Sequence, residues 1–323
     1  MNTAHPHIPV LLNEVITAMQ PVDGGVYLDG TLGAGGYSEA ILNAADCRLV
    51  AIDRDKTVFA AVRERLKDAA ERVTFIHGQF GDVEDLAKNA GFEEFDAMVV
   101  DVGVSSMQLD RAERGFSFRQ DGPLDMRMDQ NSDGQTAADI VNTYEEQDLA
   151  NIIYRYGDER KSRRIARAII EKRKDQPITT TFALADIVRS VVHKSPKDKN
   201  DPATKTFQAL RIEVNKELEE LQRFLQASEL LLKPGGRLVV VAFHSLEDGL
   251  VKRFLLEKSG QQARQSRHVP EIHVESRPSF DLSSKKSIKP TEAEISANPR
   301  SRSARLRFAT RTSIVSEKAK EAS

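Results

Sequence analysis

The chain has 323 residues, of which 40% are hydrophobic and 30% charged, and its formal net charge is -2. Its length favours two domains, or one large domain with an insertion, and no apolar run approaches the ~20 residues that a membrane span needs. The single cysteine, Cys47, excludes an internal disulfide and a cysteine-rich zinc site. Because the N-terminus also has no secretory signal pattern, we expect a cytoplasmic protein without membrane association.

Short apolar runs alternate with helical segments through the first third of the chain. Strands are predicted at residues 26–29, 48–53, 73–77 and 97–101, and helices at residues 38–45, 56–70 and 83–90. Nearly continuous apolar strands that alternate with helices are typical of a buried parallel sheet. We therefore predict an α/β, Rossmann-like fold.

The alternation stops after Asp101, and the next convincing strand is at residues 237–242. Between them, helices are predicted at residues 137–153, 161–173, 182–192 and 213–232. We predict that residues 109–211 form an inserted, mostly helical domain for substrate recognition, and that residues 1–108 and 212–323 form one discontinuous domain. Residues 259–298 are polar and are expected to be a loose excursion before a last strand at residues 304–309.

A glycine-rich loop at residues 29–36 follows the first strand. Glycines such as Gly33 let the backbone approach a ligand, and the next helix offers free N–H groups to a carboxylate or phosphate. Asp53 ends the second strand, where it can accept hydrogen bonds from both ribose hydroxyls of an adenosine. This pair suits a nicotinamide dinucleotide and S-adenosylmethionine alike. Ser38 stands where the dinucleotide motif has glycine or alanine, so S-adenosylmethionine is favoured and a dehydrogenase is the alternative.

Three further positions lie at the carboxyl edge of the predicted sheet, where such sheets bind ligands. Phe80 follows the third strand, where its ring either lies against an adenine or packs in the core. Asp101 begins a polar turn that is either a reaction site or an ordinary turn whose serines cap the next helix. His244 follows the strand at residues 237–242, where it either contacts substrate or caps the following helix.

Basic residues gather in two segments. Residues 155–174 contain nine Lys or Arg and three acidic residues, a charge that attracts nucleic-acid phosphates, although charged helices are more often only solvated. The second cluster comprises Arg300, Arg302, Arg305, Arg307 and Arg311. Cys47, in contrast, precedes the second strand at the opposite edge from the candidate site, so we expect a structural thiol and no cysteine nucleophile.

Six segments carry a family resemblance. They are residues 5–14 (HPHIPVLLNE), 29–36 (DGTLGAGG), 101–109 (DVGVSSMQL), 114–129 (RGFSFRQDGPLDMRMD), 243–248 (FHSLED) and 298–303 (NPRSRS). They resemble the bacterial RsmH (MraW) family, which methylates the N4 amine of a cytosine in small-subunit (16S) ribosomal RNA. The resemblance covers nearly the whole chain and implies a class I S-adenosylmethionine-dependent methyltransferase fold with an inserted helical domain.

The resemblance also implies site residues. Cofactor contacts are implied for Gly35, Gly36, Tyr37, Asp53, Phe80, Asp101 and Gln108, with Gly33 in the same loop. The family commonly has histidine at the position of Tyr37, so that contact is expected only if the position uses its backbone.

For the reaction we expect direct methyl displacement, without a covalent enzyme intermediate or a metal. The amine would be flanked by Asp101, Ser105 and Ser106, with His244 at the same edge. Arg163, Arg164 and Arg167 are expected to grip the RNA. A non-catalytic RNA-binding protein is the second alternative, and the oligomeric state and the choice between naked RNA and an assembled subunit stay open.

Overall fold

The computed structural model describes residues 9–194, 200–261 and 277–313. The chain forms two compact units, one made of Met1–Gly103 with Leu218–Ser323 and the other of Val104–Glu217. The predicted insertion, residues 109–211, lies within the second unit. None of the helices in the described ranges is long and apolar enough to cross a membrane.

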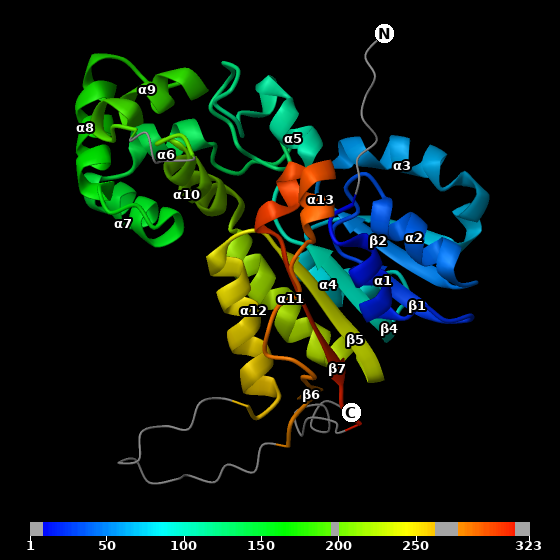
Figure 1. The fold of residues 1–323 in the computed structure, drawn as a ribbon. Helices are drawn as coiled ribbons and strands as arrows, with labels where there is room; N and C mark the ends of the chain where they lie inside the picture. Colours follow the sequence, from blue (N-terminus) through cyan, green and yellow to red (C-terminus); the bar gives the residue numbers. More distant parts are fainter. Residues whose placement is uncertain (1–8, 195–199, 262–276, 314–323) are drawn as a thin grey trace, which may run out of the picture. The chain divides into compact units, whose positions relative to one another are not determined.

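A seven-stranded sheet forms the centre of the first unit, in the order β3-β2-β1-β4-β5-β7-β6 (Figure 1). The strands are β1 Val26–Asp29, β2 Arg48–Asp53, β3 Val73–His77, β4 Phe95–Asp101, β5 Leu232–Ala242, β6 Phe280–Asp281 and β7 Arg305–Arg311. Neighbours among β1 to β5 pair in parallel, whereas β7 is antiparallel to β5 and β6. This doubly wound order confirms the predicted Rossmann-like fold. The strand order reverses between β1 and β4, the switch point beside which such sheets bind ligands.

Helices cover both faces of this sheet. They are α1 Leu12–Met19, α2 Gly36–Ala44, α3 Phe59–Arg65, α4 Val83–Asn89, α11 Glu217–Leu231, α12 Ser245–Lys258 and α13 Glu292–Ala297, with 3-10 turns η1 Lys56–Val58, η2 Lys67–Arg72, η3 Phe80–Asp82 and η5 Pro299–Ser303. Successive strand residues face opposite sides. Tyr27 therefore packs in one core with Ile41 of α2, and Leu28 packs in the other core with Phe224 of α11.

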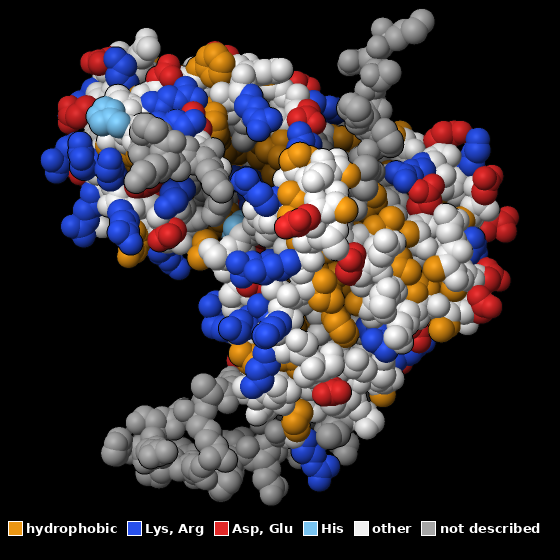
Figure 2. All heavy atoms as spheres, viewed as in Figure 1, with side chains coloured by type: hydrophobic (Ala, Val, Ile, Leu, Met, Phe, Trp, Pro, Cys, Tyr) orange, Lys and Arg blue, Asp and Glu red, His pale blue; other side chains and the backbone are white. Residues whose placement is uncertain are grey.

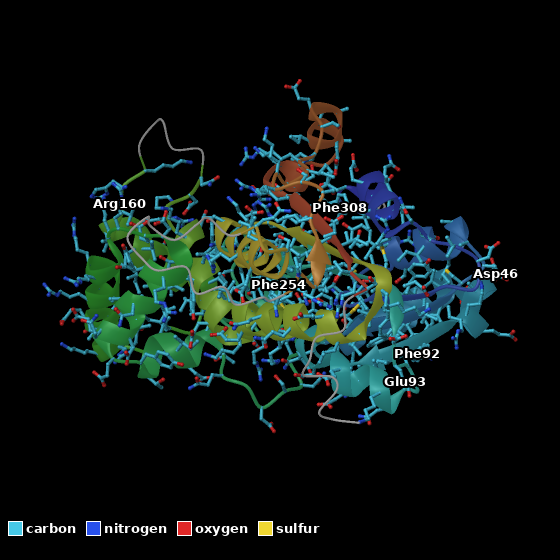
Figure 3. The ribbon with its side chains drawn as sticks, turned by 90° about the horizontal axis from the view of Figure 1, so that it is seen from below. Asp46, Phe92, Glu93, Arg160, Phe254 and Phe308 are labelled. Carbon is cyan, nitrogen blue, oxygen red and sulfur yellow. The ribbon has the colours of Figure 1, made fainter. Side chains whose placement is uncertain are left out.

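The edge of the sheet opposite the candidate site contains Cys47. The thiol is buried and lies 3.8 Å from the Ile41 carbonyl oxygen. Burial raises its pKa, which disfavours the nucleophilic thiolate. The neighbouring side chain of Asp46 is exposed at the rim of the unit (Figure 3). These features agree with the structural role expected for this thiol.

The second unit is helical. Its helices are α5 Ser106–Asp110, η4 Ala112–Arg114, α6 Ala137–Thr143, α7 Glu146–Gly157, α8 Ser162–Asp175, α9 Thr181–Val191 and α10 Thr204–Asn215. Their apolar faces meet in one core, to which Ile140, Leu149, Ile165, Leu184 and Leu210 contribute fully buried side chains. The unit thus has a hydrophobic core of its own, as an independent domain requires.

Several local predictions were wrong. The helix expected at residues 213–232 is two helices, because Lys216 adopts a left-handed conformation with φ 51° that ends α10. Residues 137–153 likewise divide into α6 and α7, because Tyr144 has an extended backbone with ψ 150°. The excursion expected at residues 259–298 contains β6 and α13, and Phe280 is buried. Residues 262–276 of that prediction lie outside the described residues.

Candidate active site

The glycine loop joins β1 to α2 beside the switch point. Gly33 and Gly35 have φ values of 49° and 78°, which residues with a side chain rarely adopt. At Gly30, a Cβ atom would lie 2.7 Å from Val100 Cγ1, so only glycine fits there. Gly35 is the N-cap of α2 and has no side chain to accept from the first turn. The N–H groups of Gly36 and Tyr37, which have no partner among the described residues, therefore suit an anionic ligand group.

Asp29 and Ser38 hold the loop from beneath. Ser38 Oγ donates to Asp29 Oδ2 at 2.8 Å, and the Thr31 N–H donates to Asp29 Oδ1 at 3.1 Å. Burial raises the pKa of Asp29 to about 6, although these hydrogen bonds oppose the shift. A dinucleotide site uses a small residue at position 38 for close packing of helix on strand. Here a buried hydrogen bond joins α2 to β1 instead.

The carboxylate of Asp53, at the end of β2, is oriented by two backbone groups. Oδ2 accepts from the Gly33 N–H at 2.8 Å, and Oδ1 accepts from the Asp55 N–H at 2.8 Å. Burial raises its pKa, and the two hydrogen bonds limit the shift. Each oxygen retains a second lone pair. Asp53 can therefore accept from two adjacent hydroxyl groups, as its predicted contact with a ribose requires.

Phe80 begins η3, directly beside the glycine loop. Its Cβ lies 3.2 Å from the point where a Cβ on Gly30 would stand. The ring makes an edge contact with Phe224, with centroids 5.6 Å apart at an interplanar angle of 81°. Since the side chain is only half-buried, it belongs to the core and still borders the loop. Its contact with an adenine stays a prediction.

Asp101 ends β4, and one of its two carboxylate oxygens is unsatisfied among the described residues. Its backbone N–H donates to Thr31 Oγ1 at 2.7 Å, a role for Thr31 that the sequence analysis missed. Asp101 Oδ1 is buried and has no hydrogen-bond partner among the described residues. Burial, and then the charges of Asp29 and Glu247, raise its pKa well above the ordinary value. A buried acceptor without a partner is costly, so this oxygen is suited to a donor that arrives with a ligand.

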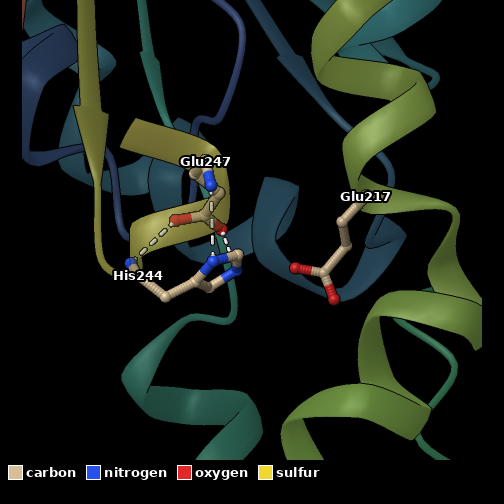
Figure 4. Close-up of side chains that lie close together, drawn as sticks. All are labelled: Glu217, His244 and Glu247. Carbon is tan, nitrogen blue, oxygen red and sulfur yellow. Dashed lines mark hydrogen bonds and ion pairs between the residues drawn. The ribbon is translucent and has the colours of Figure 1, made fainter. Parts of the chain in front are cut away.

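His244 is the N-cap of α12 (Figure 4). Its Nδ1 accepts from the Glu247 N–H at 3.4 Å, and Glu247 Oε1 lies 2.8 Å from its Nε2. Glu247 Oε2 accepts from the backbone N–H groups of Phe243 and His244 at 2.8 and 3.1 Å. His244 thus caps α12, which is one of the two roles that the sequence left open. Its catalytic role stays a prediction. Sequence analysis missed Glu247, although its spacing from His244 is that of a capping box.

Comparison with known proteins identifies the family. The model of the MraW methylase family matches residues 4–312. The chain belongs to this family. Among its curated relatives, "Ribosomal RNA small subunit methyltransferase H" of Parvibaculum lavamentivorans is 53% identical, covering 96% of this chain and 91% of the relative. The protein of the same name from Paramagnetospirillum magneticum is 56% identical, covering 95% of this chain and 96% of the relative. The predicted family is confirmed.

The chain is also similar to solved structures. A SAM-dependent O-methyltransferase from Thermotoga maritima is 11% identical with a TM-score of 0.41, covering 98% of this chain and 71% of that protein.

Tyr37, where the family commonly has histidine, uses its hydroxyl in a hydrogen bond to the N-terminal segment. The hydroxyl donates to the Val10 carbonyl oxygen, and the side chain is buried. Burial, followed by the charges of Asp101 and Asp29, raises its pKa well above the ordinary value. The phenol is thus already hydrogen-bonded within the protein. A cofactor contact at this position therefore depends on the backbone.

Ser105, Ser106 and Gln108 lie in the second unit, at the start of α5. Ser105 Oγ accepts from the Gln108 N–H at 3.2 Å, and Gln108 Oε1 accepts from the Ser105 N–H at 3.1 Å. These bonds form a capping box. Ser105 therefore has the capping role that was its structural alternative. The predicted catalytic roles of both serines, and the cofactor contact of Gln108, are not tested by this geometry.

The predicted RNA-binding arginines lie on α8, and Figure 2 shows many Lys and Arg side chains over the helical unit. Arg163 and Arg164 are exposed, with no ion-pair partner in the part of the chain that the structure describes. Arg167 Nε lies 3.6 Å from Glu146 Oε1 on the surface. All three cations face solvent.

The C-terminal basic cluster is partly structural. Arg307 is buried and donates from Nε to Asp248 Oδ1 at 2.7 Å. Arg311 is also buried and donates to the carbonyl oxygens of Glu229 and Ser279, each at 2.9 Å. These guanidinium groups hold β7 to its neighbours. Only part of this cluster is therefore available for phosphates.

Proposed function

We propose that this chain transfers a methyl group from S-adenosylmethionine to the exocyclic N4 amine of a cytosine in small-subunit (16S) ribosomal RNA. The observation that carries the proposal is Asp101 Oδ1, a buried acceptor without a described partner beside the glycine loop. Relatives at 53% and 56% identity are named ribosomal RNA small subunit methyltransferases, which supports the RNA substrate. Such a substrate favours action in the cytoplasm.

The residues at this edge fit the cofactor. The free N–H groups of the first turn of α2, at Gly36 and Tyr37, suit the methionine carboxylate. Asp53 has two oriented oxygens for the ribose hydroxyls. Phe80 borders the loop where an adenine would lie. When bound, S-adenosylmethionine supplies an electrophilic methyl group on a sulfonium.

Asp101 prepares the amine. The lone pair of an exocyclic cytosine amine is delocalised into the ring, so the amine is a weak nucleophile. A hydrogen bond from the amine to Asp101 Oδ1 would help localise the lone pair and aim it at the methyl group. We propose a second acceptor from Ser105 or Ser106, which follow Asp101 in sequence.

Asp101 also provides a place for the proton. Methyl transfer would break the methyl–sulfur bond of the sulfonium, leaving a neutral thioether, as the new C–N bond forms, and the positive charge on nitrogen would then be relieved by loss of one proton. The raised pKa of Asp101 makes its carboxylate a better proton acceptor than an ordinary aspartate. The proton moves from nitrogen to Oδ1, which leaves a neutral carboxyl group and a neutral secondary amine. Solvent then takes the proton from Asp101.

The helical unit would hold the RNA. A cytosine must leave its stack before its amine can reach the edge of a sheet, and flanking phosphates must be held while it does so. The exposed arginines of α8 can supply that attraction.

The test is methyl transfer from isotopically labelled S-adenosylmethionine to unmodified small subunits and to naked 16S RNA, with mapping of the product by mass spectrometry. We expect one methylated cytosine with the label on N4, and the two substrates show which form of the RNA is used. A product on carbon 5, or no transfer to either substrate, would contradict the proposal.

A further inference from the structure

The peptide group between Val10 and Leu11 is held on both sides by side chains from distant parts of the chain. Its carbonyl oxygen, on Val10, accepts from the Tyr37 hydroxyl at the start of α2. Its N–H group, on Leu11, donates to Glu294 Oε1 of α13 at 2.8 Å. One peptide unit thus joins the N-terminal segment, the helix after the glycine loop and a helix near the C-terminus.

Leu11, whose N–H belongs to this peptide group, has a strained backbone conformation. Leu11 has φ 53° and ψ 35°, a left-handed conformation that is unfavourable for a residue with a side chain. Its side chain is fully buried. Such a conformation persists only where its surroundings fix it, and the bonds from Tyr37 and to Glu294 do so here. Strain held in this way often accompanies a functional site.

The held segment lies directly against the glycine loop. A Cβ atom on Gly36 would stand 2.1 Å from Pro9 Cγ, so the loop backbone and Pro9 are already in contact. Gly35, the preceding residue, is in the left-handed region with φ 78°. Because a glycine-rich backbone has many accessible conformations, its geometry depends on what packs against it. The position of residues 9–11 therefore influences the geometry of the N–H groups at the start of α2.

The hydrogen bond that the Tyr37 hydroxyl donates persists across the physiological pH range. Burial and the neighbouring charges of Asp101, Asp29 and Glu294 raise the pKa of the phenol well above its ordinary value. The hydroxyl thus remains a donor throughout the physiological range. Glutamate at 294 supplies the acceptor that the Leu11 N–H needs in a buried position.

We propose that Tyr37 and Glu294 are positioning residues that latch residues 9–11 against Gly36 and thereby set how tightly the first turn of α2 holds the methionine end of the cofactor. The identity of that cofactor rests on the proposed function. The latch is the set formed by Pro9, Val10, Leu11, Tyr37 and Glu294. We assign these side chains an effect through the loop backbone and no part in the methyl transfer itself.

The test compares Tyr37→Phe and Glu294→Ala with the unchanged full-length chain. Titration calorimetry gives the Kd for S-adenosylmethionine and S-adenosylhomocysteine, and steady-state kinetics separates KM from kcat. We expect each variant to raise both Kd values about fivefold to tenfold, as the loss of one buried hydrogen bond does. In Glu294→Ala, the kcat at saturating cofactor and the KM for RNA should not change.

Two further variants separate positioning from general stability. Glu294→Gln retains an oxygen acceptor for the Leu11 N–H and should restore most of the affinity lost in Glu294→Ala. Glu292→Ala, at an exposed position on the same helix α13, should leave both Kd values unchanged. Because Tyr37 and Glu294 act on one peptide group, the double variant should lose less affinity than the product of the single losses.

The outcomes distinguish the two proposals. If the variants bind the cofactor like the unchanged chain while their Tm falls, the latch is only structural and this inference is overturned. Single losses that multiply fully in the double variant would also overturn it, since they would show two independent effects. If instead the unchanged chain does not bind S-adenosylmethionine, the proposed function fails first.

Discussion

The sheet edge of the first unit and the α8 face of the second unit differ in the burial of their charged side chains. At the edge, Asp29 is buried and its pKa is raised to about 6. Asp101 there also has a raised pKa. On α8, Arg163 and Arg164 are exposed to solvent. The difference teaches that burial gives a carboxyl group a changed affinity for protons, whereas exposed cations can provide only attraction that salt screens.

Two carboxylates at the sheet edge also differ from each other in their hydrogen bonding. Asp53 accepts a backbone N–H on each oxygen, so its orientation is fixed before any ligand binds. Asp101 Oδ1 is buried without a partner among the described residues. The first arrangement is suited to binding, and the second to a group that changes its protonation during a reaction. The following predictions test whether this division is correct.

The largest effect should follow from Asp101→Asn. The amide has nearly the same shape but cannot accept the amine proton, so kcat should fall about 10³-fold, within the usual range for loss of a general base. Cofactor affinity should fall far less than kcat, because the amide oxygen can still accept a hydrogen bond. Single-turnover methyl transfer to unmodified small subunits measures the first quantity, and calorimetry measures the second.

The pH profile of the unchanged enzyme gives an independent test of Asp101. Only the carboxylate can accept a proton, and its pKa is raised by burial and by the charges of Asp29 and Glu247. Activity should therefore fall on acidification at a higher pH than an ordinary aspartate would give. Full activity of Asp101→Asn, or a pH–rate profile without a fall at acidic pH, would show that Asp101 does not accept the proton.

The next effect concerns stability and Asp29. Its folded pKa of about 6 exceeds the ordinary value of 3.8. Its contribution to stability is thus fully present below about pH 4 and is lost as pH rises through about 6. About two pKa units at 1.36 kcal/mol each correspond to a loss of about 3 kcal/mol. Asp29→Asn should abolish this loss.

Urea unfolding at pH 4.5 and pH 7.5 measures the Asp29 effect as the difference between variant and unchanged chain. Asp46→Asn is the control, because that side chain is 85% exposed. If the unchanged chain and Asp29→Asn show the same pH dependence, Asp29 is charged at no cost and the comparison of buried and exposed charges fails at this residue.

A smaller effect is expected for Asp53→Asn. The variant keeps one oxygen acceptor and loses the charge, so it loses one of the two backbone bonds that orient the side chain and one charge-assisted hydrogen bond to the ribose. Such a bond contributes about 2 kcal/mol, which corresponds to an increase of about 30-fold in the Kd for S-adenosylmethionine. The kcat at saturating cofactor should change little. A large fall in kcat with unchanged Kd would reverse the roles assigned to Asp53 and Asp101.

The sequence predicted the elements whose signal is local. Strands β1, β2 and β3 have the predicted limits, because apolar runs bounded by turn residues are read directly from the chain. Asp53 and Asp101 were found for the same reason, since each ends an apolar run. The family resemblance then supplied the cofactor and the substrate.

The features that escaped prediction depend on contacts between distant residues. The bond from Leu11 to Glu294 joins positions 283 residues apart in sequence. Lys216 ends α10 in a left-handed conformation that no local pattern marks. The capping role of His244 was left open because a cap and a ligand contact use the same residue types at a helix start. In each case the tertiary structure decides between alternative structures or roles that the sequence allows equally.

The smallest effect should come from α8. Replacing Arg163, Arg164 and Arg167 with glutamine should weaken binding of 16S RNA about tenfold at physiological salt and reduce its salt dependence. Cofactor affinity should not change, and the surface pair of Arg167 with Glu146 contributes little to stability. The matched control replaces Lys172 and Lys174 with glutamine, because both are exposed on the same helix and pair with local acids. Equal losses per charge removed, with three charges removed in the arginine variant and two in the control, would mean that the net charge of the unit attracts the RNA. Unchanged affinity in the arginine variant would show that these exposed cations are only solvated.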